Sequence, residues 1–270
     1  MSLISHKKIF YVNSKNRLSG TNSDFAINLP LDPTDDFDRV SVMQASIPKS
    51  YYLIQDGLNT FTVTEDVTST TITIPPGNYT RRSIQVTVEN LLNGIGVRTY
   101  SISWPSVESA ATGKFTFTVN NIGGVQPIFT FSDNNIGEVL GFDLNSSNQF
   151  SGFSLVSTNV INLQLETTLY LHSDICTNGH DDVLQEIYSS GDASYSNIVF
   201  QNFDLEAYSK KLVSKNKQYY TFKLTNEDGQ PIDLNGVSMQ LSLILFKHND
   251  IYGYQKQFIQ YQLLTEQQNK

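Results

Sequence analysis

Short stretches in which apolar and polar residues alternate dominate the chain. The alternation is clearest in Arg39–Ile47, Phe61–Thr64 and Thr71–Ile74. A period of two residues is typical of a strand that buries one face, and the polar turn between the last two stretches predicts a hairpin. Further strands are predicted at Ile9–Val12, Phe25–Leu29, Thr99–Trp104, Lys114–Val119, Ile128–Ser132, Val160–His172, Asn197–Phe203, Tyr219–Thr225 and Val237–Lys247.

One segment has the spacing of a helix instead. Pro75–Asn78 interrupts the strand pattern, Thr80 is of a type that caps helices, and Gly94 is placed to end one. Between these signals, four apolar residues fall on a single helical face: Ile84, Val88, Leu91 and Leu92. The pattern therefore predicts one helix that packs against a sheet.

Four segments lack such a clear period. Asn135–Leu140 and Asp181–Tyr188 are expected to form short helical turns, and Asn145–Ser157, rich in Ser, Asn and Gly, is expected to be a linker or a long loop. The tail from Tyr252 onward is rich in Gln and Tyr and is expected to be a last strand or an arm. Many strands without alternating helices predict an all-β fold, a sandwich or a barrel.

The composition narrows the class of protein. The 270 residues include 18 Lys and Arg against 26 Asp and Glu, which gives a net charge of 18 − 26 = −8. An acidic chain is poorly suited to coat nucleic acid. The single cysteine, Cys176, excludes an intrachain disulfide and favours a reducing compartment. No secretory signal is visible, and no apolar run approaches the ~18 residues of a membrane span.

Motifs that carry catalysis are missing from the sequence. It has no P-loop, no G-x-G-x-x-G, no H-E-x-x-H and no G-x-S-x-G. One cluster has side chains that could bind a transition metal: His172, Asp174, His180 and Asp182. It matches no known ligand spacing, so we interpret it as the end of a strand that runs into a polar loop. A nucleophilic Cys176 would need one of these histidines as its base. We predict no catalytic residues, no metal and no cofactor.

Basic residues gather near the N-terminus of this acidic chain. The first 17 residues hold no acid and five basic side chains: His6, Lys7, Lys8, Lys15 and Arg17. Such a local excess indicates an arm that contacts a polyanion or an acidic partner surface. The alternative is an ordinary solvated terminus.

Four segments, taken in order, resemble one family. They are Ile74–Thr80 before the predicted helix, Leu140–Phe142 after a strand pair, Leu169–Ile175, and Phe222–Gly236 before a long apolar strand. Their order and spacing are similar to those of the penton, or minor capsid, proteins of virophages, Polinton-like elements and related large DNA viruses. The resemblance covers roughly residues 40 to 247.

The resemblance implies a structural virion protein, not an enzyme. It implies a single jelly-roll β-sandwich, at residues 1–54 and 158–270, with a small inserted α+β subdomain at 55–157. Five copies would form a homopentamer at each icosahedral vertex of the virion, contact the neighbouring major capsid protein and assemble in the host cell interior. The basic arm would then face packaged DNA or inner capsid components. Jelly-roll strands would supply the core residues Val40, Val42, Leu163, Leu165, Leu169, Leu171, Phe222, Leu224, Leu241, Leu243 and Leu245.

The length of the chain and its lack of an attachment motif bear on which capsid protein it resembles. The major capsid proteins of these viruses are double jelly rolls of about twice this length, which favours the vertex protein, and the chain has no Arg-Gly-Asp attachment motif. The alternative is a carbohydrate-binding or host-attachment jelly-roll protein, in which Trp104 and Tyr100 would stack on sugar rings. A hydrolase would need a concave pocket with converging carboxylates.

Overall fold

The computed structural model describes residues 7–104, 112–121, 124–132, 136–164, 168–176, 182–189, 195–213 and 215–248. Strands predominate in this part of the chain, and the strand pairs are antiparallel. The chain separates into two compact units, one of Met1–Tyr51 with Glu166–Lys270 and one of Tyr52–Leu165. The sequence predicts 55–157 for the inserted part.

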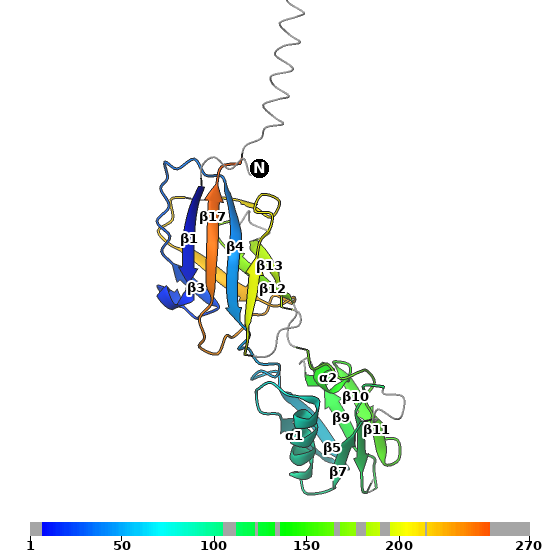
Figure 1. Ribbon diagram of the computed structural model, residues 1–270. Helices are drawn as coiled ribbons and strands as arrows, with labels where there is room; N and C mark the ends of the chain where they lie inside the picture. Colours follow the sequence, from blue (N-terminus) through cyan, green and yellow to red (C-terminus); the bar gives the residue numbers. More distant parts are fainter. Residues whose placement is uncertain are drawn as a thin grey trace, which may run out of the picture. The chain divides into compact units, whose positions relative to one another are not determined.

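Two sheets form the first unit (Figure 1). In one sheet the strands lie in the order β1 (Lys7–Asn13), β17 (Gln240–Phe246), β4 (Arg39–Pro48) and β14 (Asn197–Gln201), and the short β15 (Lys210–Lys211) also pairs with β4. The other sheet has the order β13 (Val183–Tyr188), β12 (Thr168–Ser173), β16 (Tyr220–Thr225), β3 (Asp24–Ile27) and β2 (Ser19–Gly20). Apart from the pairs β2–β3, β12–β13 and β14–β15, successive strands of this unit alternate between the two sheets, so the fold is a jelly roll, as predicted.

The jelly roll is closed by strands from opposite ends of the sequence. β1 pairs with β17 over its whole length, from Lys7 opposite Phe246 to Asn13 opposite Gln240. Asn13 then caps the 3₁₀ turn η1 (Ser14–Asn16), because its side chain accepts a hydrogen bond from the Lys15 amide at 2.9 Å. The first sheet therefore depends on contacts between residues more than 200 positions apart.

Apolar residues on the inner faces of both sheets fill the jelly-roll core. Phe25 of β3 and Phe222 of β16 stack there with their ring centroids 5.7 Å apart. Each fully buried side chain of this size contributes roughly 1.5–3 kcal/mol relative to exposure. Nine of the predicted core residues are buried, namely Val40, Val42, Leu169, Leu171, Phe222, Leu224, Leu241, Leu243 and Leu245.

The second unit has its own sheets and core. One sheet has the order β10 (Ser146–Gln149), β9 (Ile128–Phe131), β5 (Thr60–Glu65) and β6 (Thr68–Thr73), and the other has β11 (Ser154–Val156), β8 (Thr116–Val119) and β7 (Tyr100–Ser103). The helices are α1 (Arg81–Asn93) and α2 (Ile136–Leu140). The core combines aliphatic side chains with many aromatic ones, among them Phe61, Phe117, Phe129, Phe131, Phe142 and Phe150.

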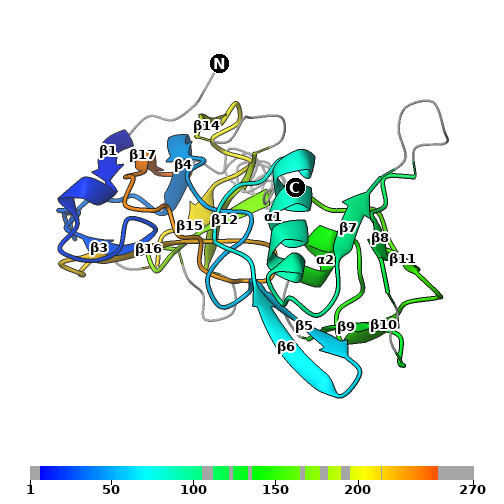
Figure 2. The same ribbon diagram turned by 90° about the horizontal axis from the view of Figure 1, so that it is seen from below.

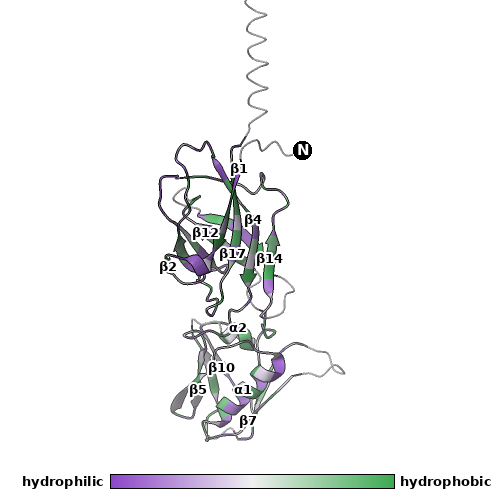
Figure 3. Ribbon diagram, turned by 60° about the vertical axis from the view of Figure 1, so that its left-hand side comes forward, coloured by the Kyte–Doolittle hydropathy of each residue, from purple (hydrophilic) through white to green (hydrophobic). Residues whose placement is uncertain are grey.

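Helix α1 begins where the sequence predicts it. The Thr80 hydroxyl accepts from the Ser83 amide at 3.2 Å and the Ser83 hydroxyl accepts from the Thr80 amide at 2.9 Å, which makes a capping box. α1 lies beside β7 (Figure 2) and mixes hydrophobic with hydrophilic residues along its length (Figure 3). Its buried residues are Ile84, Val88 and Leu92, whereas Leu91 is only partly buried.

A charged pair lies inside the second unit. The side chains of Arg98 and Glu65 are 2% and 4% exposed, and Arg98 Nε lies 3.8 Å from Glu65 Oε1. The Tyr100 hydroxyl donates to the same carboxylate oxygen at 2.6 Å, and burial is the main cause that raises the pKa of Tyr100. Arg98 also binds Asp66 at 3.1 Å. The second unit thus combines an aromatic core with a buried polar cluster.

Three predictions about local structure are wrong. Residues predicted as helical turns at Asp181–Tyr188 contain strand β13, because β12 pairs with them from Val183 to Tyr188. The predicted linker Asn145–Ser157 contains β10 and β11, which complete the edges of two sheets. The predicted strand over Val160–His172 is limited to β12; Leu163 packs on the second unit's core, and Leu165 lies outside the described residues. The tail from Tyr252 also lies outside them.

Neither α1 nor α2, the helices within the described ranges, is long and apolar enough to cross a membrane.

Candidate interaction surface

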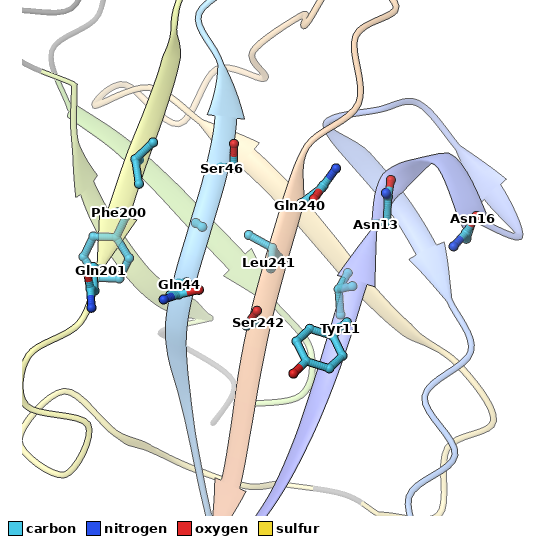
Figure 4. Close-up of a pocket in the computed structure, with 13 residues that line it drawn as sticks. Tyr11, Asn13, Asn16, Gln44, Ser46, Phe200, Gln201, Gln240, Leu241 and Ser242 are labelled. Atoms are coloured by element: carbon cyan, nitrogen blue, oxygen red, sulfur yellow. The ribbon is translucent and has the colours of Figure 1, made fainter.

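The outer face of the first jelly-roll sheet carries two rows of cross-strand neighbours, mostly polar. One row consists of Tyr11, Ser242, Gln44 and Gln201, and the other of Asn13, Gln240, Ser46 and Val199. The row between them, Val12, Leu241, Ala45 and Phe200, has the opposite orientation, because successive residues of a strand point to opposite faces. Figure 4 shows how side chains from β1, β17, β4 and β14 come together on this face.

The part of this face that carries the two rows contains no formal charge. It forms a concavity of about 460 Å³, and none of the thirteen described residues that line it is Asp, Glu, Lys, Arg or His. Two of its side chains are largely exposed, Tyr11 at 80% and Val199 at 77%. Amides and hydroxyls can exchange water for a partner's hydrogen bonds, and no ion is left buried and unpaired. We name the outward residues of the two rows the neutral face: Tyr11, Asn13, Gln44, Ser46, Val199, Gln201, Gln240 and Ser242.

A second concave surface lies at the open edge of the jelly roll, between β13 and β14. This edge groove has a volume of about 800 Å³. Its rim carries three exposed aromatic side chains: Tyr188 at 68%, Phe203 at 92% and Tyr208 at 60%. On its floor, Gln185 is 8% exposed, and its Oε1 atom has no hydrogen-bond partner within the described structure.

Glu186 lines the edge groove together with two tyrosines, Tyr170 and Tyr188. It accepts hydrogen bonds from the hydroxyls of Tyr188 and Tyr170. The hydrogen bond to Glu186 raises the pKa of Tyr188, and burial followed by the charges of Glu186 and Glu227 raises the pKa of Tyr170.

The predicted basic residues are placed within the folded jelly roll wherever the structure describes them. Lys7 and Lys8 belong to β1, and Lys8 lies 3.7 Å from Asp35. Arg17 donates to the carbonyl oxygens of Ser14 and Gly20, both at 3.0 Å. His6 lies outside the described residues, and Lys15 belongs to η1. From Lys7 onward this segment is part of the sheet and its first turn, not a separate arm.

The four side chains considered as metal ligands are divided among different partners. His172 Nδ1 lies 2.7 Å from Asp182 Oδ1, and its Nε2 lies 2.9 Å from the Thr225 hydroxyl. Asp174 instead binds Lys217 and the Thr221 amide, both at 2.8 Å. His180 lies outside the described residues, which contain no group of three His, Cys, Asp or Glu side chains placed to hold a metal.

Cys176, the other residue considered for chemistry, is 3% exposed. Its thiol donates to the Ser173 carbonyl at 3.4 Å, so it is placed as a packed core side chain. Neither His172 nitrogen faces it, because one binds Asp182 and the other Thr225.

The side chains considered for sugar stacking are occupied. Tyr100 is 1% exposed and its hydroxyl binds the buried Glu65, so that half of the interpretation is wrong. One face of the Trp104 ring is covered by the guanidinium of Arg81, and Phe115 lies 6.5 Å away between ring centroids. Among the described residues, three exposed aromatic side chains gather at the edge groove instead: Tyr188, Phe203 and Tyr208.

Neither the neutral face nor the edge groove was predicted from the sequence. The signal for the neutral face was present as polar residues at alternate positions, Tyr11 and Asn13, Gln44 and Ser46, and Gln240 and Ser242. Each pair lies on one face of a strand. Nothing in the sequence indicated that the three strands are neighbours.

Comparisons with known proteins bear on the fold. No protein-family model matches the chain, and no curated protein matches it. Among solved structures, the chain is similar to the crystal structure of selenomethionine-labelled mavirus penton protein, with 13% sequence identity and a TM-score of 0.50. The match covers 90% of this chain and 100% of that one. The chain therefore has a penton-like, jelly-roll fold.

Proposed function

We propose that the chain is a structural virion protein, the penton capsomer of an icosahedral capsid. Five copies form a ring at each vertex and contact the surrounding major capsid proteins, after assembly in the host cell interior. The observation that carries the proposal is the jelly roll with its insertion, which matches the mavirus penton protein along the whole of that chain. The proposal assigns the protein no catalytic step.

The neutral face supports a role in the ring. Five-fold symmetry requires that one surface of each copy meets a different surface on the next, and such contacts close when the rotation is 72°. A surface without charges can be buried in this way at low electrostatic cost. We propose that the neutral face is one side of this contact.

Basic residues at the end of the first sheet where β1 begins support contact with a polyanion. The register places Lys7, Phe246, Arg39 and Lys211 in one row across four strands. Lys7 and Lys211 are exposed. We propose that this row, with His6 and Lys8, faces packaged DNA or inner capsid components; Lys15 and Arg17 follow the other end of β1 and are not part of this surface.

We also propose that Tyr52–Leu165 is a separately folding domain inserted into the connection between β4 and β12. The support is that its sheets, helices and hydrophobic core come from this stretch of sequence alone.

The mass of the purified protein tests the ring. The expected assembly is a pentamer of about 5 × 30.3 ≈ 152 kDa. Light scattering over a concentration series, with electron microscopy of the largest species, measures both mass and symmetry. A dimer or trimer that persists at all concentrations would contradict the vertex assignment.

A charge placed on the neutral face tests its part in the ring. Gln44→Lys inserts a cation into the row of Tyr11, Ser242 and Gln201, so the pentamer should dissociate at concentrations where the original chain assembles. The matched control is Gln230→Lys, at an exposed turn outside the neutral face. Equal assembly of both variants would show that the ring uses another surface.

A further inference from the structure

The loop on the rim of the edge groove is braced so that it presents an apolar side chain to solvent. The Asn202 side chain donates to Ser41 and Val42 at 3.1 and 3.2 Å. The Asp204 carboxylate accepts from the amides of Glu206 and Ala207. Phe203 lies between these two anchors and is nevertheless 92% exposed. Phe203 exposes its ring together with Tyr188 and Tyr208 along one groove, and a grouped apolar surface of this kind marks an interaction site.

The described chain ends beside this same loop. The His248 amide donates to Asp38 at 2.7 Å, and His248 Nδ1 lies 3.5 Å from the carboxylate of Glu206. Residues 249–270 therefore start at the rim that carries Phe203, Ala207 and Tyr208. This leaves 270 − 248 = 22 residues, and extended chain spans about 3.3 Å per residue, which is ample to follow the groove.

The segment 251–264 has the composition that such a groove requires. Eight of its fourteen residues are large and apolar: Ile251, Tyr252, Tyr254, Phe258, Ile259, Tyr261, Leu263 and Leu264. Its single charge is Lys256. The groove is lined by two carboxylates, Glu186 and Asp204, and one ammonium group, Lys210, so the charges are complementary.

We propose that residues 251–264 dock in the edge groove of their own chain and cover Tyr188, Phe203 and Tyr208. Because the segment is tethered at the rim, its effective concentration at its own groove exceeds that of a neighbour's segment. The inference does not depend on the vertex assignment.

Paired cysteines test the docking in the full-length protein. Phe203→Cys is combined in turn with Tyr254→Cys, Phe258→Cys and Tyr261→Cys, and intramolecular disulfide formation is followed by mass under mild oxidation. At least one pair should oxidise tenfold or more faster than the same tail cysteine combined with Tyr219→Cys, an exposed position outside the groove. Equal rates, or disulfide-linked dimers, would overturn the proposal; dimers would assign the groove to a neighbouring copy.

Truncation after His248 gives a second readout that does not rely on cysteine chemistry. Removing the segment should lower the melting temperature by roughly 2–4 °C, which is the scale of a modest contact in a domain of this size. Added peptide 249–270 should restore it, and Phe203→Ser should weaken the peptide's effect while Tyr219→Ser does not. An unchanged melting temperature, or no response to the peptide, would overturn the proposal. Light scattering on the truncated chain reports separately on the pentamer.

Discussion

The jelly-roll unit and the inserted unit bury their cores in different ways. In the jelly roll, Lys7 pairs with Phe246, and the inner side chains are mainly aliphatic. In the inserted unit the sheets, helices and hydrophobic core come from Tyr52–Leu165, the core holds many phenylalanines, and the unit also contains a buried ion pair. The inserted unit is therefore expected to fold from contacts within one continuous stretch, whereas the jelly-roll sheet pairs both ends of the chain.

The largest effect is expected in the aromatic core of the inserted unit. Phe129 lies 5.2–5.5 Å, between ring centroids, from Phe61, Phe117 and Phe150. Phe129→Ala should therefore destabilise this unit by about 3–5 kcal/mol. Calorimetry should show one transition that moves down while the jelly-roll transition stays in place. A single transition that shifts as a whole would show that the two units unfold together.

The matched change in the jelly roll is Leu243→Ala. Leu243 is 0% exposed and lies opposite Val42 at the centre of the first sheet. The expected loss is about 2–5 kcal/mol, in the other transition. Val86→Ala, at a half-exposed position of α1, is the control for both variants and should change stability by less than about 0.5 kcal/mol.

The buried polar cluster makes the inserted unit sensitive to alkali. Burial, with the Glu65 hydrogen bond, raises the pKa of Tyr100 above the ordinary value of 10.0. Above pH about 10 the unfolded chain loses this proton while the folded unit keeps it. Stability should therefore fall by up to about 1.4 kcal/mol per pH unit.

Denaturant titrations of Tyr100→Phe between pH 9 and 11 measure this contribution. The variant should be less stable near pH 7, because it lacks the hydrogen bond to Glu65, and its stability should fall less steeply with pH. Tyr11→Phe, at an 80% exposed position, is the control. Parallel slopes for Tyr100→Phe and the original chain would contradict the assignment.

The smallest effect is expected from deletions at the N-terminus, which distinguish the residues before β1 from the first residues of β1. Deleting residues 1–6 should leave the melting temperature unchanged. Deleting residues 1–8 also removes Lys7 and Lys8 from the ladder with Phe246 and Leu245, and should cost roughly 1–2 kcal/mol at about 0.5–1.5 kcal/mol per hydrogen bond. Equal stability of the two deletions would show that β1 contributes little at this end.

Much of the fold can be predicted from local patterns in the sequence. Alternation in Arg39–Ile47 predicted β4, and Thr80 with the spacing of Ile84 and Val88 predicted α1. These patterns suffice because a strand with one buried face and a capped helix each carry their own period. The jelly-roll fold followed from a resemblance in the order of four segments, not from the periods alone.

Other elements owe their structure to the segments that pack beside them in the fold, not to their own sequence pattern. Ser146–Gln149 has no apolar period, yet it is a strand, because the edge of β9 offers it backbone hydrogen bonds. The Val183–Tyr188 segment follows an acidic stretch that suggests a helix, and pairing with β12 overrides that preference. Leu163 packs on the core of the inserted unit, because it lies before β12, the strand with which the chain returns to the jelly roll.

The sequence by itself determined the class of fold, the capped helix and the absence of the searched catalytic motifs. The tertiary structure decided which polar positions share a surface. Tyr11, Gln44 and Ser242 are far apart in the chain, and only the register of β1, β17 and β4 makes them neighbours on one uncharged face. The physical reason is that a strand's period fixes which side each residue faces, whereas strand order depends on packing between distant segments.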